Sequence, residues 1–128
     1  MLQTAKRPAT AERRRALFTE ATEIIDRAFA QKLALDDVAR QVATSRRQLQ
    51  RAFAEAGETS FRTYLQRVRM EHAAELLRGS DQAVNAVASA VGYRQPAQFA
   101  KAFRRHHGAP PSSFRAGGGE ASMQALAA

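Results

Sequence analysis

The sequence predicts an all-α protein, and three observations indicate this class. Apolar residues recur at helical spacing along most of the 128 residues, and no segment alternates convincingly with the period of two that a half-buried strand requires. A pattern of short helix, turn and longer helix occurs twice, over about 35–57 and about 84–108. A long helical stripe separates the two copies, and the length suits one folding unit with two lobes.

The first predicted helix covers about residues 11–31 and overlaps a basic N-terminal arm, residues 1–15. Thr10 is the expected N-cap, with Glu12 in the first turn. One apolar stripe runs along the helix: Leu17, Phe18, Ala21, Ile24, Ile25, Ala28 and Phe29. The three consecutive arginines at 13–15 either grip a phosphate or form a solvated helix start, and the sequence favours neither interpretation.

The first copy, LDDVARQVATSRRQLQRAFAEAG, predicts a helix-turn-helix. Ser45 and Gln48 form a capping box that starts its second helix at about Arg46. At 100° per residue, Leu49, Ala52, Phe53 and Ala56 face one way and Arg47, Gln50 and Arg51 face the other. Arg can bond the guanine acceptors of a DNA major groove and Gln the adenine edge, so the outward face suits base reading. For a single helix, a solvated charged face would be the default interpretation.

A central helix is predicted over about 60–78, between the two copies. Its apolar stripe consists of Phe61, Tyr64, Leu65, Val68, Leu76 and Leu77. Gly79 and Ser80 end it. At 1.5 Å per residue, about 18 residues span roughly 27 Å.

The second copy, NAVASAVGYRQPAQFAKAFRRHHG, contains a proline that is expected to open a helix rather than break one. Alignment with the first copy places a helix start at about Pro96, where the missing N–H has no intrahelical partner to lose. Gln95 then takes the extended N-cap conformation. The face opposite Phe99 and Phe103 consists of Ala97, Ala100, Lys101 and Arg104, which suits thymine-methyl contact and phosphate pairing. We therefore expect the first copy to supply most of the sequence specificity and the second mainly to anchor.

The charge balance favours a polyanionic partner. Twenty Lys and Arg against twelve Asp and Glu give a net charge of +8, which points to DNA, RNA or an anionic membrane surface. The absence of cysteine excludes disulfides and thiolate chemistry, and no apolar run has the length of a signal peptide core or a membrane span. We expect a soluble cytoplasmic protein with no membrane contact. The glycine-rich stretch 116–128 is expected to be a flexible tail.

Two groups of side chains invite a metal or catalytic interpretation, and both signals are weak. His106 and His107 diverge by 100° on a helix and lack a cysteine or nearby carboxylate, so packing at the edge of the core is expected for both. Glu71, His72 and Glu75 resemble ordinary helix-surface pairs. We expect no metal, no cofactor and no enzymatic activity.

The two copies and the central helix read LALDDVARQVATSRRQLQRAF, FRTYLQRVRMEHAAELL and VASAVGYRQPAQFAKAFRRHHGAPPSSFR. Over roughly residues 16–115 they resemble the DNA-binding domain of the AraC/XylS family of transcriptional regulators, at the size of its stand-alone members. The resemblance implies a bilobed domain of seven helices whose two recognition helices enter successive major grooves, about 34 Å apart. The predicted length of the central helix agrees with that spacing.

The sequence departs from the family pattern at several positions. Ala34 stands where a capping Ser or Thr is common, and Ala43 where the first turn often has Gly, so the first motif is expected to be slightly less stable or turned differently. In the second motif, Ala97, Gln98 and Ala100 replace the usual Ser, Tyr and Ser, and Lys101 replaces a frequent Arg. The family's polar contacts to DNA do not carry over intact there.

The expected function is a sequence-specific DNA-binding transcriptional regulator of bacterial type. The candidate base readers are Arg47, Gln50, Arg51, Gln98 and Lys101. The candidate phosphate or secondary contacts are Arg46, Arg94, Gln95, Arg104, Arg105 and Arg115. Two alternatives stay open: a non-specific nucleoid-type nucleic-acid-binding protein driven by charge, and a protein-interaction adaptor on polymerase or another regulator.

The expected partners are double-stranded DNA and RNA polymerase, in the nucleoid of the cytoplasm. Because the two motifs differ, one chain is expected to bind an asymmetric site as a monomer. No room remains for a ligand-sensing domain, so the chain is either a stand-alone regulator or the C-terminal piece of a longer sensor protein. Met1 favours the first.

Overall fold

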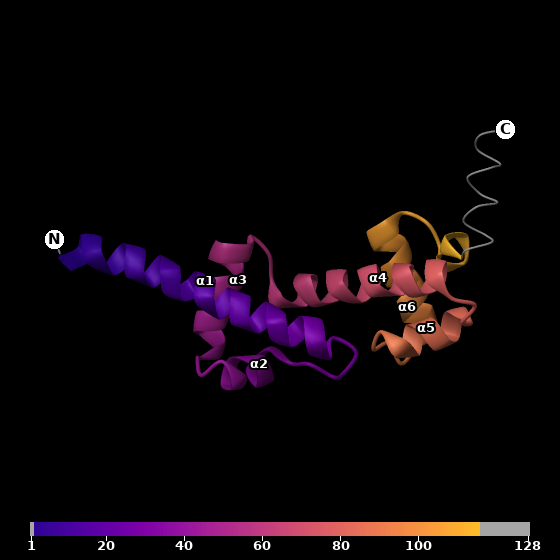
Figure 1. Cartoon of the computed structure of the whole chain (residues 1–128), viewed down its shortest axis with the longest axis horizontal. Helices are drawn as coiled ribbons and strands as arrows, with labels where there is room; N and C mark the ends of the chain where they lie inside the picture. The colour runs from indigo at the N-terminus through magenta and orange to yellow at the C-terminus, as the bar shows by residue number, and fades with distance from the viewer. Residues whose placement is uncertain (1, 116–128) are drawn as a thin grey trace. The chain divides into compact units, whose positions relative to one another are not determined.

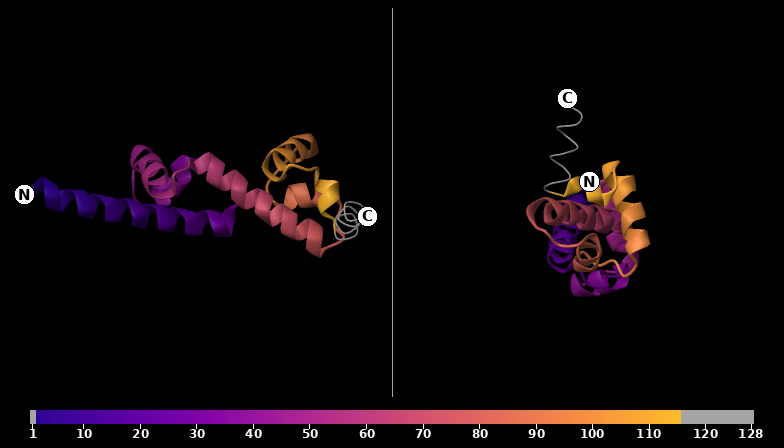
Figure 2. Two further views of the ribbon diagram at one scale, coloured as in Figure 1. Left: turned by 90° about the horizontal axis from the view of Figure 1, so that it is seen from above. Right: turned by 90° about the vertical axis from the view of Figure 1, so that its right-hand side faces the viewer.

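The protein consists of helices and connecting loops throughout the part of the chain that the structure describes. The computed structural model describes residues 2–115, with side chains from residue 9 onward (Figures 1 and 2). Its elements are α1 (Leu2–Ala28), α2 (Leu35–Gln41), α3 (Arg46–Gly57), α4 (Phe61–Gly79), α5 (Val84–Ala90), α6 (Pro96–His107) and the 3-10 helix η1 (Pro111–Phe114). The predicted all-α class is confirmed, and the seventh helical segment is a short 3-10 helix rather than an α-helix.

Two compact units divide the chain inside α4, between Leu65 and Gln66. Unit 1 contains α1, α2, α3 and the start of α4, and unit 2 contains the rest of α4 with α5, α6 and η1. Ser60 caps the start of α4: its Oγ accepts a hydrogen bond from the N–H of Thr63 at 3.1 Å. From there α4 runs for 19 residues without a break and belongs to both units.

Phe53 lies at the centre of the core of unit 1. Its side chain is fully buried, and its ring meets the rings of Phe18, Phe61 and Tyr64 edge-on at centroid distances of 5.1, 5.9 and 6.0 Å. The other buried residues of this core come from four helices: Leu17, Ala21 and Ile25 from α1, Val38 and Ala39 from α2, Leu49 and Ala52 from α3, and Leu65 from α4. α1 and α3 pack directly against each other (Figure 1), so α1 supports α3 on its buried side.

Phe99 and Phe103 of α6 form the centre of the core of unit 2. Both are fully buried, and their ring centroids lie 5.7 Å apart. Tyr93 contacts the Phe99 ring at 5.7 Å, and Phe114 of η1 contacts the Phe103 ring at 5.0 Å. The remaining buried residues are Val68, Met70, Ala73, Ala74 and Leu77 of α4, Val87 and Ala88 of α5, Val91 just after α5, and Pro111 of η1. η1 therefore completes the packing around α6.

The first helix differs from its predicted bounds at both ends. α1 begins at Leu2, so Thr10 lies inside the helix instead of capping it, and α1 ends at Ala28 rather than at about residue 31. Most residues between positions 2 and 7 favour helix, whereas Pro8 inside α1 opposes it, so composition alone does not explain why the helix begins before the expected cap. At the other end, a turn in which Gln31 N–H bonds to the Ala28 carbonyl at 2.9 Å leads the chain away from the helix.

Two further expectations concern a membrane span and the C-terminal tail. None of the described helices is long and apolar enough to cross a membrane. The tail expected over 116–128 lies outside the described residues.

Candidate nucleic-acid interface

α3 separates a buried apolar face from an exposed polar one. Ser45 caps the helix, because its Oγ accepts a hydrogen bond from the N–H of Gln48 at 3.1 Å. Leu49, Ala52 and Phe53 have no exposed area, as their spacing predicts. The three candidate base readers on this helix are all exposed: Arg47, Gln50 and Arg51. The structure thus brings them together on one solvent face.

α6 has the same division with a different start. Pro96 is the first residue of the helix, and Gln95 before it is extended, with φ −112° and ψ 116°, so the predicted role of the proline is confirmed. Gln95 makes no side-chain cap. Phe99 and Phe103 are buried on one side. The exposed candidates near and on this helix are Arg94, Gln95, Gln98, Lys101, Arg104 and Arg105.

The two turns that lead into α3 and α6 share one backbone geometry. Ala43 has a φ of 55° and Gly92 a φ of 97°, both in the left-handed region. The next residues, Thr44 and Tyr93, each donate an N–H to a carbonyl of the preceding helix at 2.9 Å. Ala43 therefore turns the chain as glycine does, so the structure contradicts a different turn, and lower stability of the first motif stays a prediction.

Protein contacts already engage two of the candidate phosphate ligands. Nη1 of Arg46 lies 3.4 Å from Oδ2 of Asp36, although 62% of the Arg46 side chain stays exposed. Arg115 donates from its guanidinium to the backbone carbonyl of Gln82. Arg115 therefore connects the end of η1 to the loop between α4 and α5, a structural role that the sequence did not predict.

A third arginine pairs across two elements of unit 1. Nη1 of Arg14 on α1 lies 2.5 Å from Oε2 of Glu55 on α3. Only 17% of the Arg14 side chain is exposed, compared with 52% of Glu55. Neither interpretation of the arginines at 13–15, phosphate contact or solvated start, describes Arg14. The sequence carried no signal for this pair, because its partners are 41 residues apart.

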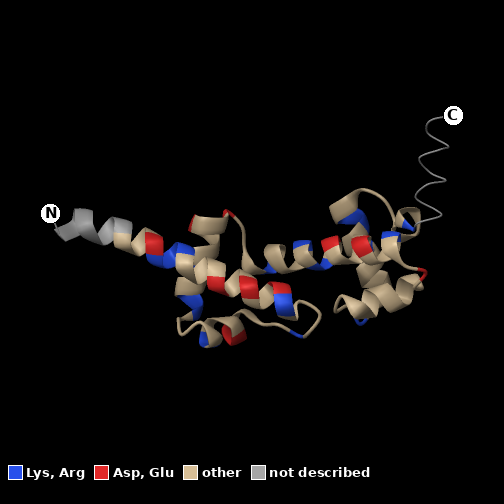
Figure 3. Cartoon of the chain, viewed as in Figure 1, with Lys and Arg blue, Asp and Glu red and all other residues tan. Residues whose placement is uncertain are grey.

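Within unit 1, α1 exposes several acidic side chains, whereas the charged side chains of α3 are mainly basic (Figure 3). The exposed carboxylates of α1 lie on the side of that helix opposite its buried residues: Glu12, Glu20, Glu23 and Asp26. α3 exposes Arg46, Arg47 and Arg51 and carries one carboxylate, Glu55, which Arg14 compensates. The exposed face of α3 is therefore positive and suited to an anionic partner.

The two adjacent histidines of α6 differ in their surroundings. His107 is partly buried; its Nε2 lies 2.9 Å from the carbonyl of Met70, and its ring lies 4.4 Å from that of Phe103 and 5.0 Å from that of Phe114. His106 is exposed, so the prediction that it packs at the edge of the core is wrong. Consecutive residues point in different directions on a helix, and here His107 faces the core while His106 faces solvent. The pKa of His106 lies below its ordinary value. The larger cause is partial desolvation of the ring, and the second is repulsion from the neighbouring His107.

The acidic and histidine residues of α4 form a surface pair. Nδ1 of His72 lies 3.8 Å from Oε2 of Glu75, three residues later. Within residues 9–115 no three His, Asp or Glu side chains gather closely enough to hold a metal ion.

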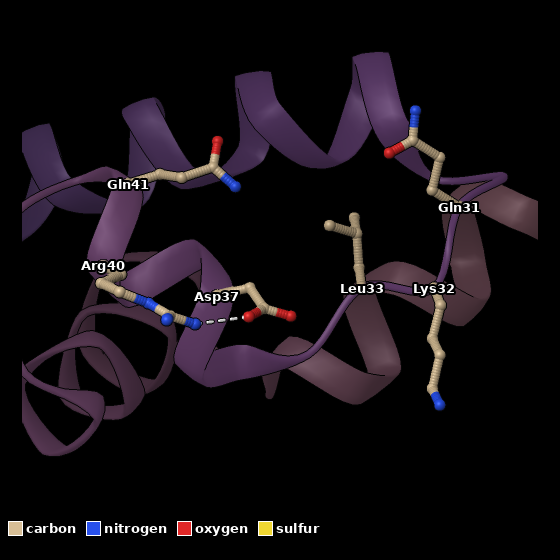
Figure 4. A pocket seen from close by; sticks show the side chains of 6 residues that line it. All are labelled: Gln31, Lys32, Leu33, Asp37, Arg40 and Gln41. Carbon is tan, nitrogen blue, oxygen red and sulfur yellow. Dashed lines mark hydrogen bonds and ion pairs between the residues drawn. The ribbon is translucent and has the colours of Figure 1, made fainter.

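A surface hollow of about 460 Å³ lies between the end of α1 and α2 (Figure 4). It is lined by Gln31, Lys32, Leu33, Asp37, Arg40 and Gln41. Arg40 pairs with Asp37 of the same helix at 2.6 Å, and Lys32 extends away from that pair. The two cations of the hollow are therefore not directed together at one point.

Known proteins resemble this chain in sequence and in structure. The profile of a helix-turn-helix domain family matches residues 38–117. The uncharacterized HTH-type transcriptional regulator YijO of Escherichia coli K12 is 36% identical over 106 residues, which are 83% of this chain and 38% of that protein. The Msm operon regulatory protein of Streptococcus mutans is 28% identical over 101 residues, which are 79% of this chain and 36% of that protein. The chain thus spans little more than a third of these curated relatives.

Solved structures resemble the fold over most of the chain. A transcriptional regulator from Chromobacterium violaceum, described as having an AraC-type DNA-binding domain, matches with a TM-score of 0.75 and 29% identity, over 79% of this chain and 90% of that one. The DNA-binding domain of AdpA, solved in complex with a target DNA, matches with a TM-score of 0.70 and 28% identity, over 79% and 90%.

Proposed function

We propose that this chain, which belongs to the AraC/XylS family of transcriptional regulators, binds specific DNA sites and regulates transcription through its two helix-turn-helix units. One observation carries the proposal. Arg47, Gln50 and Arg51 are exposed together on the side of α3 opposite the fully buried Leu49 and Phe53. Two guanidinium groups and an amide on the exposed face of a capped helix supply the donors and acceptors that read guanine and adenine edges.

The two units have unequal tasks in this proposal. α3 enters a major groove, where Arg47 and Arg51 bond guanine and Gln50 bonds adenine. α6 enters the next major groove, about 34 Å along the DNA, where Gln98 and Lys101 supply the weaker base contacts. Contacts to phosphate come from the remaining cationic and amide candidates: Arg46, Arg94, Gln95, Arg104, Arg105 and Arg115. Arg46 and Arg115 have to exchange a protein partner for DNA, so we expect the smallest contributions from these two.

The proposed cellular setting follows from the same family membership. One chain binds an asymmetric site as a monomer, because its two recognition helices present different side chains. The bound protein acts on transcription by contact with RNA polymerase, and it resides in the cytoplasm with the nucleoid. Several relatives are named as operon regulators or activators, which supports a role in transcription activation.

The decisive experiment is selection of bound fragments from a random duplex pool, followed by competition between the selected site and random DNA at one fixed salt concentration. We expect a two-part consensus with half-sites about one DNA turn apart, and affinity for the selected site at least about 10³-fold above that for random DNA. Gel filtration of the complex is expected to give one chain per site. Two chains per minimal site would contradict the monomer.

The net charge of +8 favours one competing function, non-specific binding to nucleic acid. That function predicts equal affinity for the selected and random duplexes at matched salt. A protein-interaction adaptor predicts no binding to either duplex, even at low salt. Each result would reject sequence-specific regulation by a different route.

A further inference from the structure

Arg51, a proposed base reader, has a carboxylate one helical turn away on its own helix. Glu55 stands four residues after it, and side chains at this spacing are neighbours, with Cβ atoms about 5–6 Å apart. Opposite charges at this spacing attract each other, weakly for an Arg that precedes the Glu, so Glu55 is within reach of Arg51. A guanidinium that binds its own Glu is less available to a guanine edge, because the bond to the carboxylate has to be replaced first.

In the structure the Glu55 carboxylate is bound elsewhere. Oε2 of Glu55 lies 2.5 Å from Nη1 of Arg14, and Arg51 forms no ion pair with any residue of the described chain. The Arg14 side chain is 17% exposed and lines, with Glu55, a small hollow of about 200 Å³. Arg14 is the more buried partner and Glu55 the more exposed one, and the Nε of Arg14 is buried without a hydrogen-bond partner.

A second contact beside this pair fixes α1 against the end of α3. Phe18 follows Arg14 by one turn, and its ring packs on Gly57, where an added Cβ would lie 2.4 Å from Cε1. An added Cβ would overlap the Phe18 ring, so α1 and α3 approach closely here. This contact lies one turn after Arg14 and two residues after Glu55, beside the ion pair.

We propose that Arg14 is a positioning residue for DNA reading: it withdraws the Glu55 carboxylate from Arg51 and keeps Arg51 available to a base. The proposal rests on the function proposed above for α3. Arg14 lies on α1, before residues 38–117 that the helix-turn-helix profile matches. A residue outside the recognised motif therefore influences the specificity of the motif.

The first test uses the free protein, so its result does not depend on DNA binding. The Arg14→Met substitution keeps an apolar stem in the site and removes the charge. In the full chain with ¹⁵N-labelled arginine, NMR is expected to show a shifted and more slowly exchanging Arg51 Nε–H in R14M, because Glu55 is released to Arg51. The double variant R14M/E55Q is expected to return both values to those of the wild type. An unchanged Arg51 signal in R14M would overturn the proposal.

The second test measures discrimination, the ratio of affinity for the selected site to affinity for random DNA. R14M is expected to lose discrimination by about two- to fivefold. This is the effect expected when Arg51 forms one exposed ion pair with Glu55 and the released carboxylate also repels DNA phosphate. The loss should fall at the base pair that Arg51→Ala identifies, and R14M should cause no further loss in an Arg51→Ala background. E55Q alone should keep wild-type discrimination, and R14M/E55Q should regain it.

The matched control is Arg15→Met, which removes the same charge from the exposed neighbouring position. It should change the affinity for both duplexes equally. If E55Q loses as much discrimination as R14M, the ion pair itself is required and Arg14 has only a structural role. If the wild type does not discriminate at all, the proposed function fails, and the arginine NMR of the free protein still decides whether Arg14 controls Arg51.

Discussion

The two helix-turn-helix units form the same backbone from different residues. The turn before the recognition helix has a left-handed residue in both units, Ala43 before α3 and Gly92 before α6. A second left-handed residue follows each of these helices: Glu58, with φ 51°, after α3, and Gly108, with φ 79°, after α6. Glycine adopts this region without strain, whereas a residue with a Cβ is destabilised there by about 1–2 kcal/mol. Unit 2 is relaxed at two positions where unit 1 is strained.

In side chains suited to base reading, the advantage lies with unit 1 rather than with unit 2. α3 presents three side chains that suit base reading, and α6 presents two alanines, Ala97 and Ala100, among its polar residues. The unit with the richer reading face therefore has the less favourable backbone. A comparison of stability and a comparison of DNA specificity should rank the two units in opposite orders, and the following predictions test that difference.

The largest expected effect is the loss of the central ring of unit 1. Phe53→Ala removes three edge-on ring contacts from a fully buried site and should lower the free energy of unfolding of unit 1 by about 3–5 kcal/mol. The chain has two tyrosines and no tryptophan, with Tyr64 in unit 1 and Tyr93 in unit 2. Denaturant unfolding followed by tyrosine fluorescence in Tyr93→Phe and Tyr64→Phe backgrounds reports each unit separately. Equal shifts of both signals would show that the units unfold as one.

The next effect concerns DNA reading. Arg47→Ala should reduce discrimination between the selected site and random DNA by about 1–3 kcal/mol, because one bidentate base contact is lost. Lys101→Ala should mainly weaken binding to all duplexes and reduce the dependence on salt concentration. Titration at several salt concentrations separates the two effects. Equal losses of discrimination would show that the units share base reading, against the proposed division.

The glycines near the ends of α3 and α6 should respond to alanine for different reasons. Gly57→Ala places a methyl group 2.4 Å from Phe18 and should destabilise unit 1 by about 1–3 kcal/mol through overpacking. Gly108→Ala meets open space, and only its φ of 79° opposes the substitution, so about 1 kcal/mol is expected. The combination with Phe18→Leu is informative, because a smaller side chain should relieve the first defect. No relief in the Phe18→Leu background would refute the steric explanation.

Local patterns were sufficient to predict the buried faces and the starts of α3 and α6. The spacing of Leu49 and Phe53 identified the buried side of α3, and comparison of the two copies identified Pro96 as a helix start, because both signals lie within a few residues of sequence. The bounds of α1 were less accessible. Thr10 is a good cap by residue type, and Pro8 just before it also indicates a helix start there, yet α1 begins at Leu2, so the local signals pointed to the wrong start.

Contacts between distant residues could not be read from one sequence. The Arg14–Glu55 pair and the bond from Arg115 to Gln82 join residues 41 and 33 positions apart, and no periodicity connects their positions. The different exposures of His106 and His107 likewise depend on how α6 meets Met70 and Phe114. The candidate surface of α3 was therefore predictable, whereas the residues that support it from α1 required the structure.

The smallest expected effect tests the strain comparison itself, through exchange of the two turn residues. Ala43→Gly should stabilise unit 1 by about 0.5–1 kcal/mol, because relief of a left-handed alanine, about 1–2 kcal/mol, exceeds the added flexibility of the unfolded chain, about 0.4–1 kcal/mol. Gly92→Ala should destabilise unit 2 by at least as much, because a φ of 97° lies outside the left-handed region that a residue with a Cβ tolerates. Unfolding followed at Tyr64 for the first variant and at Tyr93 for the second measures both. DNA discrimination should stay unchanged in Ala43→Gly, because neither residue offers a polar group to a base. A less stable Ala43→Gly protein would mean that unit 1 is not strained at its turn and that the two backbones differ only in composition.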